Sequence, residues 1–466
     1  MAILAVTCVL TWAVLAFGAV YPWASWPMAA AVAAIAAWRW RPKFPRGAVA
    51  WAVILVCAAV VAQLIPVATS FVTTASPAAS AFLSAFSVAY ANGFVEHHAL
   101  SIDPAETLRG LGFLVLCIVW VPTCVSVLAE AHASRALARN VAVVGTIVGI
   151  IGLAQHATFN GKLLWFWTPR FFATNGFGPF VNRNHFAGWM LLALALGVGL
   201  LFAQVKRSAP RGDANWRERL LWLGTPAASP VLLLSTSVLV MACSLVWTMS
   251  RSGIAAAGAC LTIMLVAALC RMKGSVQRWA LAGYVVLIVA GVVAWRGADR
   301  LVDWYGNTES LRWRLQLWQD TLPAAGAFWV TGSGLNTYGT LMMVQPRTDV
   351  TVQPRQAHND YLQLAVEGGV LLCIPAMLLA LTLGRAIVRA LKAPQDDGSW
   401  WIRMGAVAGI CGMAVQEISE FSLQIPAVAL LFGTCVAIAL HPAPPASGRR
   451  AARTERQHEP TTVRAA

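Results

Sequence analysis

Long uninterrupted apolar segments constrain this chain more than any other feature. Val231–Trp247 and Ile254–Leu269, for example, contain no charged residue. Of the 466 residues, 58% are hydrophobic and 11% are charged, whereas about 25% of the residues of a soluble domain are charged. A helix that crosses a bilayer needs roughly 20 mostly apolar residues. The sequence therefore predicts an all-α polytopic membrane protein and excludes a water-soluble enzyme.

Twelve apolar segments predict about twelve transmembrane helices. They lie at about 2–20, 24–38, 49–67, 109–129, 140–157, 186–204, 231–248, 252–270, 279–295, 365–384, 404–420 and 424–440. The chain then divides into helices 1–9 within 1–295, a periplasmic loop at 296–364, helices 10–12 within 365–441 and a disordered cytoplasmic tail at 442–466. The second segment is short and the eleventh contains Glu417, which makes these two spans the weakest predictions.

The basic residues predict the orientation of the helices. If the N-terminus is cytoplasmic, 23 of the 34 Lys and Arg residues fall on the cytoplasmic side, and every cytoplasmic connection contains some of them. This is the asymmetry expected of membrane proteins, whose cytoplasmic loops are basic. Both termini are therefore predicted to be cytoplasmic, and the net charge of +15 requires no nucleic acid as a partner.

The eleven basic residues predicted on the outer side have a marked bias, because ten of them are arginine. Arginine binds phosphate and carboxylate groups through a planar pair of N–H donors. For some of these residues, including Arg109, the alternative is a side chain that only reaches the lipid headgroups. The bias still favours an outer site for an anion.

Two short motifs at helix ends contain candidate site residues. Asn182, Arg183 and His185 precede the sixth predicted helix, where the alternative is an N-cap with aromatic anchors. Arg251 lies between the seventh and eighth helices with almost no loop. An arginine at that depth is costly unless it meets an anion or a carboxylate; the alternative is a tight hairpin whose arginine reaches the headgroups.

The long outer loop contains two further motifs. Leu311–Leu322 has the spacing of an amphipathic helix with Arg312 on its polar face, which predicts a helix lying on the membrane surface. Near the end of the loop, His358 is followed by Asn359 and Gln363. Histidine is suited to proton transfer near neutral pH, although a capping or surface histidine is the alternative for this position alone.

Together these motifs resemble the O-antigen ligase and polysaccharide polymerase superfamily. The resemblance covers about residues 175–370 and lies in GPFVNRNHFAGW, SRSG, RLQLW, GSGLNTY and HNDYLQLAVEGG, in that order. It implies a fold like that of C-type glycosyltransferases and transfer of a glycan from undecaprenyl diphosphate. The acceptor is lipid A–core or another glycan, and the reaction takes place on the periplasmic side of the bacterial inner membrane.

The resemblance also assigns roles to residues. It implies that Arg251, Arg314 and His358 are catalytic, and it leaves open which of Arg312 and Arg314 contacts the diphosphate. Arg312, Arg183, Asn182, His185, Asn359 and Gln363 are predicted to bind substrate. No metal and no other cofactor is predicted. A polymerase of the same superfamily and a transporter or flippase of lipid-linked glycan remain the alternative functions.

Overall fold

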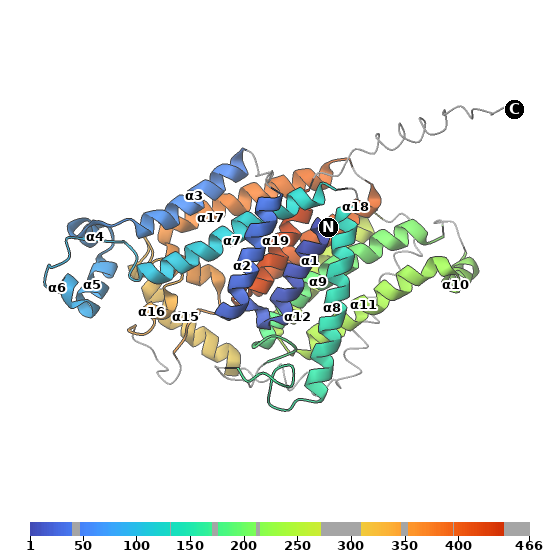
Figure 1. Cartoon of the computed structure of the whole chain (residues 1–466), viewed down its shortest axis with the longest axis horizontal. Helices are drawn as coiled ribbons and strands as arrows, with labels where there is room; N and C mark the ends of the chain where they lie inside the picture. Colours follow the sequence, from blue (N-terminus) through green and yellow to red (C-terminus); the bar gives the residue numbers. More distant parts are fainter. Residues whose placement is uncertain are drawn as a thin grey trace.

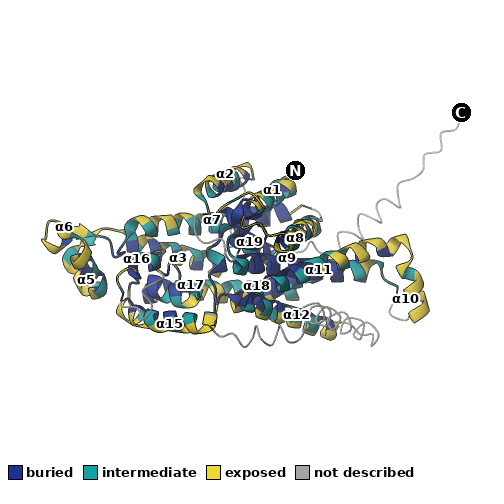
Figure 2. Ribbon diagram, turned by 90° about the horizontal axis from the view of Figure 1, so that it is seen from below, coloured by how far each residue is buried: buried dark blue, intermediate teal, exposed yellow. Residues whose placement is uncertain are grey.

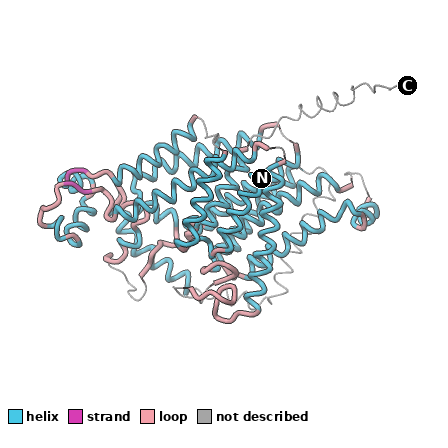
Figure 3. The backbone as a smooth tube through the Cα atoms, in the orientation of Figure 1, coloured by secondary structure: helices cyan, strands magenta, loops and turns pink. Residues whose placement is uncertain are grey.

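A computed structural model describes most of the chain as helix (Figures 1 and 3). The described residues are 1–39, 47–130, 132–169, 176–210, 215–271, 309–345, 353–394 and 396–441. Within them the one sheet consists of two short antiparallel strands, β1 (Val67–Ala68) and β2 (His97–His98). The predicted all-α architecture is confirmed.

Eleven of the predicted spans correspond to described helices. These are α1 (Ala2–Leu15), α2 (Pro22–Trp38), α3 (Ala48–Leu64), α7 (Pro104–Leu128), α8 (Ala133–Ala157), α9 (Arg183–Ser208), α11 (Ser229–Trp247), α12 (Arg251–Arg271), α17 (Asp360–Lys392), α18 (Asp397–Gln416) and α19 (Pro426–Leu440). Among the described residues, six helical segments are long and apolar enough to cross a membrane: those of α7, α8, α9, α11, α12 and α17. The predicted ninth span and the predicted tail lie outside the described residues, and the total of twelve spans stays a prediction.

Shorter elements connect these helices. They are η1 (Phe17–Ala19), α4 (Thr69–Ala75), α5 (Pro77–Phe86), α6 (Val88–Ala91), α10 (Trp216–Leu223), η3 (Pro226–Ala228), α15 (Glu309–Ala327), α16 (Tyr338–Leu341) and η4 (Ser422–Gln424). Helix α15 contains the predicted amphipathic segment. Its apolar residues Leu311, Leu315 and Leu322 are exposed, whereas Leu317 is buried against the protein. This exposed apolar row fits a helix that lies on a membrane surface.

Helix α9 forms the centre of the bundle. Every residue in the apolar part of α9 is buried, and the helix appears as a dark core in Figure 2. Small residues allow its close contact with α18: a Cβ atom on Gly199 would lie 2.6 Å from the carbonyl oxygen of Trp401, and one on Gly405 would lie 2.5 Å from that of Ala195. Such small-residue contacts are typical of packed membrane helices. The ends of α9 are thereby fixed relative to its neighbours.

The end of the eleventh predicted span differs from the prediction. Helix α18 ends at Gln416, four residues before the predicted boundary at 420, and a connection containing η4 leads to α19. The Glu417 carboxylate accepts a hydrogen bond from the backbone N–H of Ser422 at 2.8 Å, and Pro426 begins the next helix. Glu417 and Glu420 therefore lie in a connection between two helices rather than inside a span.

Candidate active site

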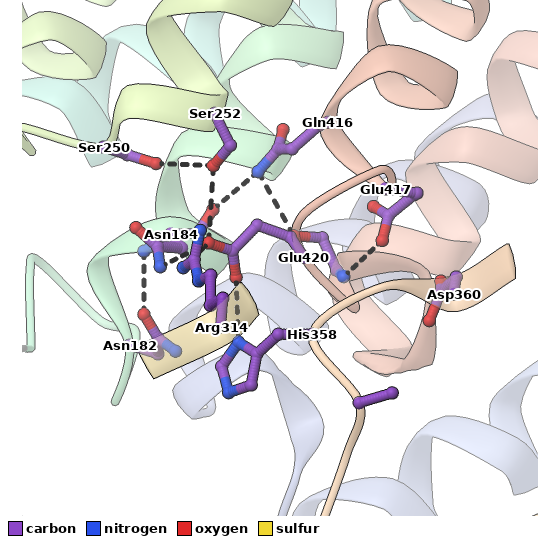
Figure 4. Close-up of polar contacts among 12 residues, drawn as sticks. Asn182, Asn184, Ser250, Ser252, Arg314, His358, Asp360, Gln416, Glu417 and Glu420 are labelled. Atoms are coloured by element: carbon purple, nitrogen blue, oxygen red, sulfur yellow. Dashed lines mark hydrogen bonds and ion pairs between the residues drawn. The ribbon is translucent and has the colours of Figure 1, made fainter. Parts of the chain in front are cut away.

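The Glu420 carboxylate is the centre of a buried polar cluster formed by five separate segments (Figure 4). One oxygen, Oε1, forms an ion pair with the Arg314 guanidinium and accepts a hydrogen bond from Asn184 Nδ2 at 2.7 Å. The hydroxyl of Ser252 donates to the same oxygen at 3.4 Å. The other oxygen, Oε2, lies 3.7 Å from Nδ1 of His358, within ion-pair range but beyond a hydrogen bond.

The first turn of α9 supplies Asn184. Asn182 caps this helix, because its side-chain oxygen accepts a hydrogen bond from the backbone N–H of Asn184 at 2.9 Å. Gln416 donates to the backbone carbonyl of Asn184 at 3.0 Å, which joins the end of α18 to this turn. The capping role considered for Asn182 is confirmed, and the amide that reaches Glu420 belongs to Asn184, which the sequence did not single out.

Helix α12 begins directly at Arg251. The hydroxyl of Ser250 accepts a hydrogen bond from the backbone N–H of Gly253 at 3.2 Å and lies 3.2 Å from the hydroxyl of Ser252. Gly253 allows close contact with α9, since a Cβ atom there would lie 2.6 Å from the Ala187 side chain. The SRSG motif therefore starts a helix that packs against α9.

Three arginines from different helices act on the same small region. The charge of Arg183 is attracted by Glu420 and repelled by Arg251 and Arg314. Three guanidinium groups thus lie in the region of one charged carboxylate, which leaves an excess of positive charge at this end of the bundle. Each guanidinium has five N–H donors, so Arg314 can pair with Glu420 and still donate to a bound anion. The electrostatics fit a phosphate or diphosphate ligand.

The backbone of His358 is held in an unusual conformation, with a φ of 49°. The residue before it is fixed from two sides. The backbone N–H of Ala357 donates to Gln363 Oε1 at 3.0 Å, and its carbonyl accepts from Trp318 Nε1 at 2.9 Å. The imidazole contacts the rings of Trp313 and Phe421 edge-on, with centroids 5.3 and 4.8 Å away. These contacts direct Nδ1 toward Glu420.

The glycine-rich loop 332–338 is fixed to α17 by Glu367. This buried carboxylate accepts hydrogen bonds from the backbone N–H groups of Asn336 at 2.8 Å and Tyr338 at 3.0 Å. Gln363 Nε2 donates to the same carboxylate at 3.0 Å. Gly332 is required at its position, since its φ is +72° and a Cβ atom would lie 2.1 Å from the Glu367 carbonyl oxygen. The loop is therefore part of the scaffold that carries His358.

The structure brings together most of the residues that the sequence singled out. Arg314 and His358 lie beside Glu420, and Arg183 lies close enough to Glu420, Arg251 and Arg314 for their charges to act on it. His185 is buried, with its ring 4.6 Å from that of Phe421. Arg312 lies on the exposed side of α15, because positions two residues apart face different sides of a helix. The ion pair with Glu420 thus distinguishes Arg314 from Arg312.

The two residues that open α17 have local partners. Asn359 caps the helix, since its side chain accepts a hydrogen bond from the backbone N–H of Leu362 at 2.9 Å. The capping role that the sequence allowed for His358 therefore belongs to Asn359. Gln363 is buried, and its amide contacts Ala357 and Glu367. Both residues hold the backbone near His358, and their predicted contact with substrate stays a prediction.

Glu420 itself was missed in the sequence. An acidic residue in or beside an apolar span is a functional hypothesis by default, because its charge is costly there. The sequence contains two such residues in this segment, and only Glu417 was noticed, as a weakness of the predicted span. The segment could have been identified on this ground as part of the site.

Two glutamates three residues apart have opposite protonation behaviour. Burial alone would raise the pKa of Glu420, but His358, Arg314 and His185 favour the charged carboxylate and hold its pKa below the usual value. Burial, together with the neighbouring carboxyl group of Asp360, raises the pKa of Glu417 well above its usual value. The surroundings therefore favour the charged form of Glu420 and the protonated form of Glu417.

Replacement of Trp318 tests how the histidine is positioned. Trp318→Phe keeps an aromatic ring but removes the 2.9 Å hydrogen bond to the Ala357 carbonyl. We expect kcat to fall about tenfold with little change in KM, since a displaced His358 affects chemistry more than ground-state binding. Steady-state kinetics of the purified variant measure kcat and KM. The matched control is Trp329→Phe, which changes an exposed tryptophan. A fall in both variants alike would contradict the positioning role.

The fold and the site define a class of protein: a helical membrane protein with a cationic, histidine-containing cluster at one end of the bundle. Residues 236–377 match a family model described as O-antigen ligase. Over these residues the match confirms the predicted resemblance to the O-antigen ligase superfamily. This family consists of membrane ligases and polymerases that act on lipid-linked glycans. A search of curated proteins gives no match to the chain.

The matched segment contains three of the site residues. Arg251, Arg314 and His358 lie within 236–377, whereas Arg183 and Glu420 lie outside it. The described residues contain no group of three or more His, Cys, Asp or Glu side chains placed to hold a metal ion. The positive charge of the cluster comes from arginine side chains.

Proposed function

We propose that this protein transfers a glycan from an undecaprenyl diphosphate carrier to lipid A–core or to another glycan on the periplasmic side of the inner membrane. The observation that carries the proposal is the convergence of three arginines in one region, where Arg314 and His358 lie beside the buried Glu420 carboxylate and Arg183 lies near both Arg251 and Arg314. A cationic cluster suits a diphosphate leaving group. A histidine beside it suits deprotonation of a hydroxyl group.

In the proposed reaction the acceptor hydroxyl oxygen attacks the anomeric carbon of the glycan. The bond between this carbon and the phosphate oxygen breaks, and undecaprenyl diphosphate leaves with the electron pair. Arg251 and Arg314 stabilise the negative charge that grows on the leaving group. His358 takes the hydroxyl proton at Nε2, while Glu420 at 3.7 Å from Nδ1 stabilises the resulting imidazolium. A direct displacement of this kind inverts the anomeric configuration.

The proposal includes no metal ion and no other cofactor, because three arginines supply the charge that a divalent cation supplies in other transferases. Purified protein in nanodiscs, incubated with lipid-linked glycan and lipid A–core, should form the ligated product in excess chelator at an undiminished rate. Restoration of lost activity by Mg²⁺ or Mn²⁺ would overturn metal independence. If the only product is elongated lipid-linked glycan, the protein is a polymerase; glycan translocation without a new bond would identify a transporter.

The proposed orientation has both termini in the cytoplasm and the active site on the periplasmic side. It can be tested by single cysteines in a cysteine-free background. Lys162→Cys lies in the exposed loop after α8, and Thr225→Cys lies in the exposed segment before α11. We expect an impermeant thiol reagent to label only the first in intact cells, since basic connections stay inside. Labelling of both, or of the second alone, would contradict the orientation.

A further inference from the structure

Aromatic side chains from two distant segments form a second cluster at the same end of the bundle. Phe17 of η1 stacks on Trp167, with ring centroids 4.9 Å apart. Tyr21 and Trp23 lie nearly parallel at 6.3 Å, and each contacts Trp167, at 5.6 and 5.8 Å. Phe166 completes the set at 6.4 Å from Phe17. We call these five residues the outer aromatic cluster.

Unusual backbone conformations are concentrated in the two segments that form this cluster. Phe17 and Ala19 have φ values of 59° and 56°, and Leu164 and Trp165 have values of 48° and 64°. Residues other than glycine adopt such conformations at an energetic cost, and these conformations tend to cluster at functional sites. Among the described non-glycine residues with positive φ, three more belong to the active site and its loops: Met249, Asn336 and His358.

The loop after α8 is fixed by hydrogen bonds in this conformation. Gln155, buried at the end of α8, accepts from the backbone N–H of Leu164 at 3.2 Å and donates to the Lys162 carbonyl at 3.4 Å. The loop closes with a hydrogen bond from the backbone N–H of Leu163 to the Trp167 carbonyl at 2.8 Å. In Figure 1 it lies at the lower edge, beyond the end of α8. An irregular loop held this firmly presents its rings in fixed positions.

The outer aromatic cluster is continuous with the active site. A Cβ atom on Gly18, next to Phe17, would lie 3.1 Å from the Ile425 side chain and 3.2 Å from the Phe180 ring. Ile425 ends the same connection that begins with Glu417 and contains Glu420. Phe421, in the same connection, contacts the His358 ring. The connection that contains Glu420 therefore also packs against the outer aromatic cluster.

We propose that the outer aromatic cluster binds pyranose rings of a glycan substrate, an inference that rests on the proposed function. The faces of aromatic rings are negative and attract the partly positive C–H groups on one face of a sugar. Trp23 is 46% exposed and Phe166 is 67% exposed, so both offer surface. Nε1 of Trp167 is a donor that is buried in the cluster and has no hydrogen-bond partner among the described residues.

Binding of a soluble glycan tests this proposal without the transfer reaction. The probe is the glycan released by mild acid from the carrier lipids of the native host, added to purified protein in nanodiscs. Saturation-transfer NMR should detect binding by the wild type. The double variant Trp23→Ala/Phe166→Ala should bind at least tenfold more weakly, whereas Trp26→Ala should match the wild type. Trp26 is 74% exposed and lies one turn further along α2, so it controls for lost membrane anchoring.

Kinetics show whether the pyranose rings bound at the cluster belong to the donor glycan or to the acceptor glycan. The double variant should raise the KM for one of the two substrates about tenfold and leave kcat within twofold, because it removes ground-state binding. Phe166→Ala alone, at the most exposed position, should give a smaller shift in the same KM. The proposal would be overturned if the folded variants kept the glycan binding and the KM of the wild type. It would also be overturned if the double variant bound only sugar-free undecaprenyl phosphate more weakly and bound the glycan as the wild type does.

The outcomes separate this proposal from the proposed function. If the double variant equals the wild type while Arg314→Lys loses transfer, the transferase function stands and the aromatic binding site is wrong. If the wild type transfers no glycan yet binds it, and the double variant does not bind, the aromatic site stands and the transferase function is wrong.

Discussion

Glu420→Gln should abolish most glycan transfer, by about 10²-fold or more, although the side chain keeps its size. The charged carboxylate pairs with Arg314 and lies beside His358, so an amide removes the partner of both. Loss of one partner of a buried ion pair leaves the other charge uncompensated, and a general base contributes about 10²–10⁴-fold to rate. The transfer assay with purified variant and saturating lipid-linked glycan measures the effect.

Glu417→Gln is the matched control for this result. Glu417 is equally buried and three residues away, but burial and the neighbouring Asp360 carboxyl group raise its pKa and so favour its protonated form. A glutamine side chain resembles a protonated glutamate in shape and can still accept the hydrogen bond from Ser422. We expect Glu417→Gln to retain at least half of the wild-type transfer. Equal losses in both variants would mean that the connection is sensitive to any change and that Glu420 has no special role.

The pH dependence of stability gives Glu420 a second signature. Its pKa is lower in the folded protein than the ordinary value of 4.5. Its interactions therefore stabilise the fold fully above that value, and this contribution is lost as the pH falls through the lowered pKa. The thermal midpoint of the wild type should decline over that acidic range. Glu420→Gln should remove this part of the decline, since it has no proton to bind.

Much of the fold could be predicted from the sequence because one physical requirement dominates it. Crossing lipid demands long apolar helices, and this requirement marks segments such as Val231–Trp247 without any tertiary information. The boundary at Gln416 was missed because Val415 and Ile418 continue the apolar pattern past the helix end. Hydropathy does not detect a helix end that is set by the hydrogen bond from Ser422 to Glu417.

The site was predictable to the extent that its residues are chemically unusual in their segment. Arg251 and Arg314 are charges beside apolar sequence, and His358 is a histidine in a polar motif. Trp318 is an ordinary residue in sequence, and its importance comes from a hydrogen bond to the backbone carbonyl of Ala357. This contact joins two segments that are far apart in the chain, and no local pattern indicates it.

His358→Ala and Arg314→Lys should both lose most transfer, but in different kinetic parameters. Without the imidazole, no group takes the hydroxyl proton, so kcat should fall about 10²–10⁴-fold with donor binding nearly unchanged. Lysine keeps the charge of Arg314 but offers a single compact ammonium in place of the planar fork, so it cannot make a bidentate contact with a phosphate while it pairs with Glu420. We expect Arg314→Lys to lower kcat about 10²–10³-fold and to weaken donor binding as well.

Arg312→Lys provides the comparison within the same helix. Arg312 is exposed, two residues before Arg314, and lies on another side of α15. The Arg312→Lys variant should transfer glycan at close to the wild-type rate, because the guanidinium of Arg312 is not the one paired with Glu420. Kinetics with both substrates varied, and donor binding measured separately, distinguish the three variants. If Arg312→Lys is as impaired as Arg314→Lys, or if His358→Ala keeps the wild-type kcat at limiting acceptor, the assignment of the active site is wrong.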